Sequence, residues 1–181
     1  MSNTAVALDG RINSRERSFT FFGSARDHAR MSTLRSEADA VLVGGATFRN
    51  WPHPALPDAA DRDALVTRPW NVVVTRSLDV PLDTGFLEEA AIRPLFLTRT
   101  ASLPAGFSAD HEAWPGEGDL PVEWMLGCLA GRGIERLLIE AGGDLLFQFL
   151  AARVMQMAAV ISMAHCQAIR CVRRKYASPD N

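Results

Sequence analysis

Short apolar runs alternate along this chain with stretches of helical character. The apolar runs are typical of buried strands and cover residues 4–8, 40–43, 71–75, 94–98 and 137–139. Helices are predicted between them, over residues 25–36, 46–50, 122–130 and 144–152. Strands that alternate with helices form a largely parallel sheet with helices packed on its faces. The pattern therefore predicts an α/β fold.

Local signals place helix ends and loops within this pattern. Ser24 can cap the first helix, with the negative charge of Asp27 in its first turn. Gly131 marks the end of the third helix. Two segments rich in proline, glycine and acidic residues, 51–69 and 103–121, are predicted as loops, the first with room for one helical turn.

Two of the predicted strands run directly into paired glycines that open a helix. They are Gly44-Gly45-Ala46-Thr47, here called the first glycine turn, and Gly142-Gly143-Asp144, the second glycine turn. Bare backbone at a helix N-terminus can present several N–H donors to a phosphate, and two such turns suggest a dinucleotide. The alternative is that the glycines only permit tight turns or close packing. The spacing is not that of the Rossmann fingerprint.

Other polar residues follow or precede the same strands. Thr75, Arg76 and Ser77 come directly after a valine-rich strand, and a guanidinium flanked by two hydroxyls suits a ribose 2′-phosphate. An exposed loop arginine is the alternative. Glu140 precedes the second glycine turn, and a buried carboxylate there is expected to accept hydrogen bonds from turn amides or a ligand hydroxyl.

Composition narrows the function classes. A chain of 181 residues with 48% hydrophobic residues fits one domain with a sizeable core. A net charge of −2 argues against nucleic-acid binding. No apolar run approaches the roughly 20 residues of a membrane span, and no signal peptide is evident, so a cytoplasmic location is expected. The three cysteines and four histidines show no metal-ligand spacing, and no metal is expected.

Several motifs in order resemble the reductase domain of the riboflavin-pathway deaminase/reductase proteins. They are residues 7–10, 24–28, 34–48 and 138–145, and the resemblance covers roughly residues 3–153. Ala7 and Ala141 stand where the family has serine and glycine. The resemblance implies a dihydrofolate-reductase-like, three-layer α/β fold with a largely parallel mixed sheet. It also implies NADPH as cofactor, held by both glycine turns, and a homodimer.

The resemblance also implies roles near the substrate. Asp27 corresponds to a pocket carboxylate on the helix before the second strand, and Asp9 lies beside the expected nicotinamide. Ser24 and Arg35 resemble positions that touch the ribose phosphate of the substrate, and Trp51 could stack on its heterocycle. The alternatives are a helix-dipole partner for Asp27, a turn residue for Asp9, a solvated cation for Arg35 and local core for Trp51.

Two regions depart from the family pattern. Asn50-Trp51-Pro52 stands where the family has Asp-x-Pro, which weakens the assignment of the riboflavin precursor as substrate. After Arg153 the family's strand pattern is lost. We therefore expect a reductase domain over 1–153 and an atypical tail over 154–181, with the helix from Asp144 running past Arg153. The terminal family strands would be missing or altered, a sheet edge exposed, and residues after about 172 poorly ordered.

The sequence thus predicts an NADPH-dependent oxidoreductase acting on a small molecule. By resemblance, hydride passes from the nicotinamide to a carbonyl or imine carbon, as in 5-amino-6-(5-phosphoribosylamino)uracil reductase. Two alternatives stay open: a pterin or dihydrofolate reductase, and a non-catalytic NADP-binding protein inactivated by its tail. The motifs of the deaminase domain, His-x-Glu and Pro-Cys-x-x-Cys, are absent from the sequence.

Overall fold

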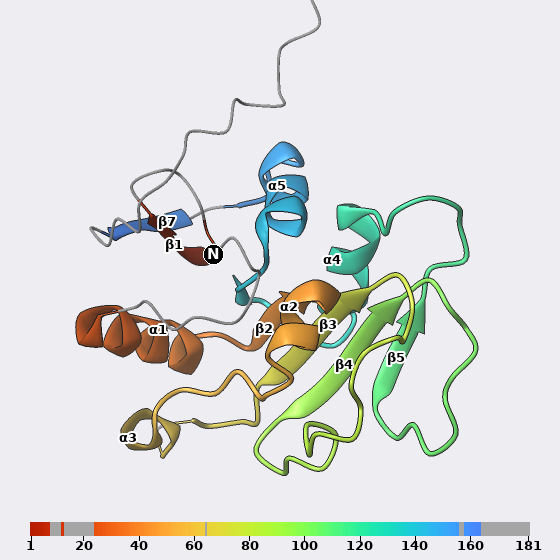
Figure 1. Cartoon of the computed structure of the whole chain (residues 1–181), viewed down its shortest axis with the longest axis horizontal. Helices are drawn as coiled ribbons and strands as arrows, with labels where there is room; N and C mark the ends of the chain where they lie inside the picture. The colour runs from red at the N-terminus through yellow and green to blue at the C-terminus, as the bar shows by residue number, and fades with distance from the viewer. Residues whose placement is uncertain (8–11, 13–23, 64, 156–157, 164–181) are drawn as a thin grey trace, which may run out of the picture.

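The computed structural model describes residues 1–7, 12, 24–63, 65–155 and 158–163. In this part of the chain seven strands form one sheet in the order β5-β4-β3-β2-β6-β1-β7 (Figure 1). Every pairing between the described strands is parallel. The strands are β1 (Ser2–Ala7), β2 (Ala40–Gly44), β3 (Trp70–Thr75), β4 (Arg93–Thr98), β5 (Asp110–Ala113), β6 (Leu137–Ile139) and β7 (Ala158–Met163).

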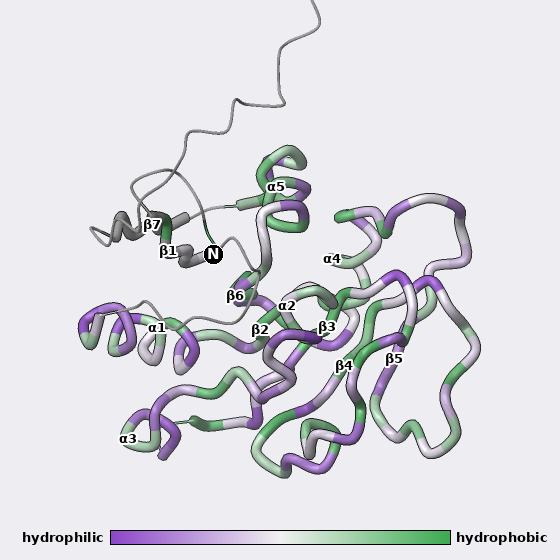
Figure 2. Tube along the Cα trace, in the orientation of Figure 1, coloured by the Kyte–Doolittle hydropathy of each residue, from purple (hydrophilic) through white to green (hydrophobic). Residues whose placement is uncertain are grey.

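Helices cover both faces of this sheet. They are α1 (Ala25–Glu37), α2 (Gly45–Asn50), α3 (Ala59–Arg62), α4 (Val122–Ala130) and α5 (Gly143–Ala151). Alternate residues of a strand point to opposite faces, so Val72 and Val74 of β3 pack with α4 and α5, whereas Val73 packs with Phe48 of α2. Figure 2 shows the resulting hydrophobic colour along β2 and β3. The expected three-layer α/β fold is confirmed.

Most of the predicted elements form where the pattern places them. The Ser24 hydroxyl accepts a hydrogen bond from the Asp27 backbone N–H at 3.2 Å, so the expected cap of α1 is present. α4 buries Met125 and Leu129 on one face and ends at Gly131. The short α3 is the single helical turn expected within the loop after α2. None of the helices described is long and apolar enough to cross a membrane.

One strand lies where only a loop was expected. β5 falls within residues 103–121 and pairs with β4 from Leu95 opposite Asp110 to Thr98 opposite Ala113. It is an edge strand with exposed or half-buried side chains. Its pairing depends on backbone hydrogen bonds, and an edge strand needs no alternation of apolar residues.

The structure also corrects the prediction for the C-terminal region. α5 ends at Ala151, and Arg153 adopts a left-handed φ of 56°, so the helix does not run past Arg153. β7 then pairs with β1 along its whole length, from Ser2 opposite Ala158 to Ala7 opposite Met163. The expectation of a missing strand is wrong here, and β1 is not an exposed edge. Residues 164–181, including the tail expected to be poorly ordered, lie outside the described residues.

Candidate active site

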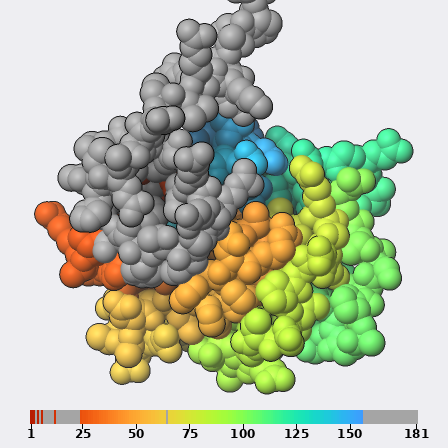
Figure 3. Space-filling view, in the orientation of Figure 1, coloured from red at the N-terminus to blue at the C-terminus, as the bar shows by residue number. Residues whose placement is uncertain are grey.

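A cleft lies at the carboxyl edge of the sheet, where β2, β3 and β6 end. Because these strands are parallel, the segments that follow them meet at one edge. In Figure 3, α2 (orange), the segment after β3 (yellow) and α5 (blue) lie on the displayed face. The cleft has a volume of about 660 Å³ and is lined by Gly44, Gly45, Ala46, Thr47, Arg49, Val74, Thr75, Arg76, Ser77, Asp79, Asp119, Leu120, Gly142, Gly143, Asp144, Leu145 and Gln148.

All residues predicted to hold the cofactor line this cleft except Glu140. Both glycine turns and the segment Thr75–Ser77 are therefore brought together, as the position of their strands predicts. Sequence reasoning missed Arg49, Asp79, Asp119 and Gln148. No motif marks these four positions, because each depends on where its loop or helix turn comes to lie against the strand ends.

Glycine is required by close packing in the first glycine turn but not in the second. A Cβ added to Gly45 would lie 2.8 Å from Oγ1 and 2.9 Å from Cβ of Thr75, so Gly45 permits close packing of α2 against β3. A Cβ added to Gly142 would meet Thr47 Oγ1 only at 3.9 Å, which is an ordinary contact. Gly45 thus fits the packing alternative, whereas a Cβ at Gly142 would fit without a clash.

Backbone donors are available at the second glycine turn. The first intrahelical hydrogen bond of α5 runs from the Leu146 N–H to the Gly142 carbonyl at 3.0 Å. The N–H groups of Gly143, Asp144 and Leu145 precede it and have no partner within the helix. They lie in the lining of the cleft, at the positive end of the helix dipole. An anion placed there would receive hydrogen bonds.

Charged side chains of both signs line the cleft. Arg76 Nε lies 3.0 Å from Asp119 Oδ1, and both side chains are largely exposed. Arg49 donates from Nη1 to the backbone carbonyl of Asp79 at 3.2 Å. The Thr75 hydroxyl donates to the Ser77 carbonyl at 2.5 Å and holds the turn after β3. Arg76 is thus exposed, paired with Asp119 and part of the cleft lining, and its role toward a 2′-phosphate stays a prediction.

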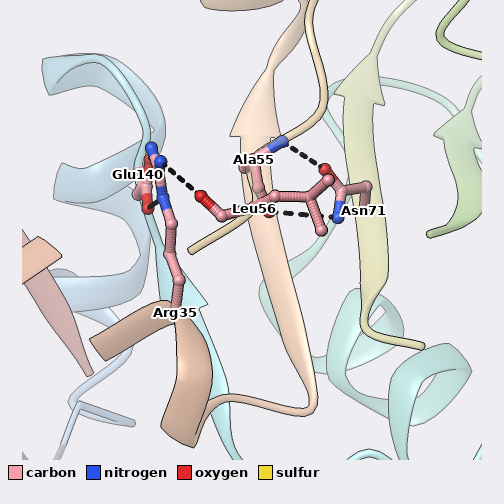
Figure 4. A network of polar contacts seen from close by, with 5 residues as sticks. All are labelled: Arg35, Ala55, Leu56, Asn71 and Glu140. Atoms are coloured by element: carbon pink, nitrogen blue, oxygen red, sulfur yellow. Dashed lines mark hydrogen bonds and ion pairs between the residues drawn. The ribbon is translucent and has the colours of Figure 1, made fainter. Parts of the chain in front are cut away.

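Glu140 and Arg35 form a bidentate ion pair beside the cleft (Figure 4). Arg35 donates from Nε and Nη2 to the two carboxylate oxygens, each at 2.7 Å, and from Nη1 to the Leu56 carbonyl at 3.0 Å. Burial opposes the charge of Arg35, but the hydrogen bond and charge of Glu140 outweigh it and raise the pKa of the guanidinium. The Glu140 carboxylate is therefore bound by Arg35, whereas turn amides or a ligand hydroxyl were the expected donors. The role of Arg35 toward a substrate phosphate stays a prediction.

The segment after Trp51 is fastened to the sheet and to α1. The buried Asn71 side chain accepts a hydrogen bond from the Ala55 N–H at 2.6 Å and donates to the Ala55 carbonyl at 3.4 Å (Figure 4). The Ser32 hydroxyl accepts from the Asp58 N–H at 2.8 Å. Trp51 itself is 44% exposed, with its ring centroid 4.4 Å from that of His53. It is not local core, and it does not line the cleft described above.

Asp27, one of the two predicted catalytic acids, is not among the residues that line this cleft. Asp27 lies in the first turn of α1, and its Oδ1 is buried without a hydrogen-bond partner among the described residues. Ser24 is exposed at the end of the same helix. Asp9 lies outside the described residues. Over the same part of the chain, no group of three or more histidine, cysteine or acidic side chains could hold a metal ion.

Residues 1–163 match the family described as the RibD C-terminal domain. The chain belongs to this family. It is thereby a member of a reductase family of riboflavin biosynthesis, and these reductases are nicotinamide-dependent oxidoreductases. The suspected relationship and the dihydrofolate-reductase-like fold are both confirmed.

This RibD-type domain matches most of the length of some known relatives and only part of others. The chain is 26% identical over 162 residues to the 2,5-diamino-6-ribosylamino-4(3H)-pyrimidinone 5′-phosphate reductase of Archaeoglobus fulgidus, covering 84% of this chain and 74% of that protein. RibD of Acinetobacter baumannii superposes with a TM-score of 0.76 at 18% identity over 93% of this chain and 46% of that one. The Saccharomyces riboflavin biosynthesis reductase Rib7 superposes with a TM-score of 0.70 at 13% identity over 91% of this chain and 72% of that one. The chain thus spans less than half of the Acinetobacter protein.

Proposed function

We propose that this RibD-type domain is an NADPH-dependent reductase of a phosphoribosylamino-pyrimidine, most like 5-amino-6-(5-phosphoribosylamino)uracil reductase. One observation carries the proposal: the cleft joins both glycine turns to Thr75–Ser77 at a single edge of the sheet. Family membership supports the nicotinamide, and the name of the Archaeoglobus relative supports the substrate class.

The residues of the cleft fit a dinucleotide. The cleft beside Gly142 and the N–H groups at the start of α5 suit a diphosphate. Arg76, between two hydroxyl residues, would hold the 2′-phosphate that distinguishes NADPH from NADH. The bound cofactor supplies a hydride to the substrate. The protein supplies binding, orientation and electrostatics.

The reduction also needs a proton. When an imine carbon gains a hydride, the imine nitrogen must gain one proton, so that the C=N bond becomes a CH–NH bond. We propose Asp27, whose buried Oδ1 has no hydrogen-bond partner among the described residues, as the group that holds this proton, and Asp9 as a second candidate. Ser24, Arg35 and Trp51 remain our candidates for substrate contacts. The outcome to measure is turnover by Asp27→Asn, which should fall more than cofactor affinity.

Cofactor titration tests the proposal most directly. Arg76→Ala should weaken NADPH binding by about 1.5 to 3 kcal/mol, the usual worth of a hydrogen bond between charged groups, and leave NADH nearly unchanged. Arg49→Ala, which removes another arginine from the same cleft, is the matched control. Equal losses for both cofactors with Arg76→Ala would exclude the 2′-phosphate role.

A pterin or dihydrofolate reductase is the second candidate. Asn50-Trp51-Pro52 replaces the acidic family motif, and Trp51 is exposed, so the substrate region differs from the expected one. Turnover with a phosphoribosylamino-pyrimidine and with dihydropterins separates these two reductases. Tight NADPH binding without turnover of either substrate would favour the non-catalytic alternative.

Three further expectations remain predictions: a homodimer, a cytoplasmic location and the division of the chain at residue 153. Analytical ultracentrifugation tests the homodimer.

A further inference from the structure

The ion pair between Arg76 and Asp119 joins two walls of the cleft. Arg76 follows β3, whereas Asp119 lies in the loop that leads into α4, and Nε and Oδ1 are 3.0 Å apart. Both residues line the cleft. The carboxylate therefore lies on the guanidinium that the proposed function assigns to the 2′-phosphate.

The fold determines where Asp119 lies. Gly118 before it adopts φ of 80°, a left-handed conformation that glycine favours, and Leu120 after it is 5% exposed. Upstream, Gly116 lies against the Trp114 ring so closely that an added Cβ would be 2.6 Å from it. Trp114 in turn packs on Trp124 of α4 at 5.6 Å between ring centroids. The backbone that carries the carboxylate is thus anchored on both sides.

Two effects of Asp119 on a phosphate at Arg76 oppose each other. The carboxylate could orient the guanidinium, but the side chains of Arg76 and Asp119 are 75% and 61% exposed, and exposed pairs hold geometry weakly. The carboxylate also repels the phosphate, which carries up to two negative charges. In addition, it occupies part of the Arg76 guanidinium to which the phosphate would bind. Repulsion is therefore the larger effect.

We propose that Asp119 is a specificity-determining residue that opposes the 2′-phosphate and so limits the preference for NADPH over NADH. This inference rests on the proposed function. It assigns a residue outside both glycine turns to cofactor choice. The ion pair has to open when the phosphate binds, and the carboxylate remains beside the phosphate afterwards.

Asp119→Asn tests this, because it removes the charge and keeps the shape. Its dissociation constant for NADPH should fall about 3- to 10-fold, and that for NADH should change less than 2-fold. Competition by 2′,5′-ADP, which carries the 2′-phosphate without a nicotinamide, should strengthen to the same degree, whereas competition by ADP should not. The gain should shrink at high salt. Urea unfolding of the variant checks that its fold is intact.

Two further variants distinguish an effect of the Arg76–Asp119 ion pair on NADPH binding from a general effect of negative charge in the cleft. Asp79→Asn removes another carboxylate from the same cleft, and that side chain forms no ion pair with Arg76 in the described chain. It should change NADPH affinity less than 2-fold. In an Arg76→Ala background, Asp119→Asn should increase NADPH affinity less than 2-fold, because the guanidinium that Asp119 pairs with is absent.

The possible results differ clearly. Unchanged or weaker NADPH binding by Asp119→Asn overturns the inference, and so does an equal gain with Asp79→Asn. Wild-type protein that binds neither NADPH nor NADH overturns the proposed function itself, and the inference falls with it. Wild-type binding of NADPH with a selective gain in Asp119→Asn supports both.

Discussion

At the scale of single residues, Gly45 and Gly142 look alike in sequence but should respond differently to substitution. Gly45→Ala places a methyl group within 3 Å of the Thr75 side chain, so it should destabilise the fold by about 1 to 3 kcal/mol. At Gly142 the backbone has an ordinary conformation, with φ of −64°, and a Cβ would make only an ordinary contact with Thr47. Gly142→Ala should therefore change the free energy of unfolding by less than about 1 kcal/mol.

Urea unfolding and NADPH titration together check this contrast. Gly142→Val, which places a larger side chain in the lining of the cleft, should weaken NADPH binding while the protein remains folded. If Gly45→Ala were as stable as wild type, the close approach of α2 to β3 would not need a glycine. If Gly142→Val bound NADPH normally, the second glycine turn would be only structural.

The pair of Arg35 and Glu140 should contribute to stability at the same scale. Glu140→Gln leaves a half-buried guanidinium with a neutral partner, and we expect a loss of about 1 to 3 kcal/mol, less than for a fully buried pair. A double variant, Arg35→Met with Glu140→Leu, should recover part of this loss. Arg30→Gln on the exposed face of α1 is the control and should change the free energy of unfolding by less than about 0.5 kcal/mol.

Sequence reasoning predicted the cleft residues that directly follow strands and missed cleft residues that depend on distant loops. Gly44 and Gly142 could be predicted to line one cleft, because parallel strands end at one edge. The pairing of Arg35 with Glu140, or of Arg76 with Asp119, depends on side chains from segments far apart in the sequence. No local motif encodes such a contact.

At the scale of elements, Asp39 joins the starts of β2 and β6. Its carboxylate accepts hydrogen bonds from the backbone N–H groups of Glu135 and Arg136, at 3.1 and 2.7 Å, and from the Arg136 side chain at 3.1 Å. Partial burial of this carboxylate opposes its ionisation. The bonds from Arg136 and Glu135 outweigh that effect, and the pKa of Asp39 lies below its ordinary value of 3.8.

A lowered pKa makes this contribution depend on pH. The folded state favours the ionised carboxylate, so the stabilisation is complete above about pH 5 and is lost as pH falls through the lowered pKa. Asp39→Asn should cost about 1 to 2 kcal/mol at pH 7, and the difference from wild type should shrink below pH 3.8. Urea unfolding from pH 3 to 7 measures the difference in free energy of unfolding between wild type and Asp39→Asn. A difference that grows on acidification would contradict this account.

The elements that sequence reasoning missed have weak local signals. β5 has no apolar alternation, since an edge strand is fixed by backbone pairing with β4. α5 stops without a glycine or proline, because Arg153 takes the left-handed conformation that glycine usually supplies. By contrast, β2 and β3 are buried on both faces and could be predicted from their apolar runs alone.

At the scale of the whole molecule, β7 lies at one end of the sheet formed by the described strands. Among these strands it is an edge strand, and it uses one side of its backbone to pair with β1. Hydrogen exchange should therefore show alternate protected and unprotected amides between Ala158 and Met163, with protection lost when β1 unfolds. Uniformly fast exchange across these residues would show that the strand does not form in solution.

The place of β1 between β6 and β7 has a consequence for how the chain folds during synthesis. β2 to β5 are neighbours both along the chain and in the sheet, so they can assemble in the order in which they emerge from the ribosome. β1 is made first, yet its partners come last: the Met1 amino group bonds to the Leu137 carbonyl, 136 residues further on. Such long-range closure is slow. Until it happens, the nascent chain carries an unpaired first strand and an open edge on β2, which are the surfaces that chaperones and proteases engage.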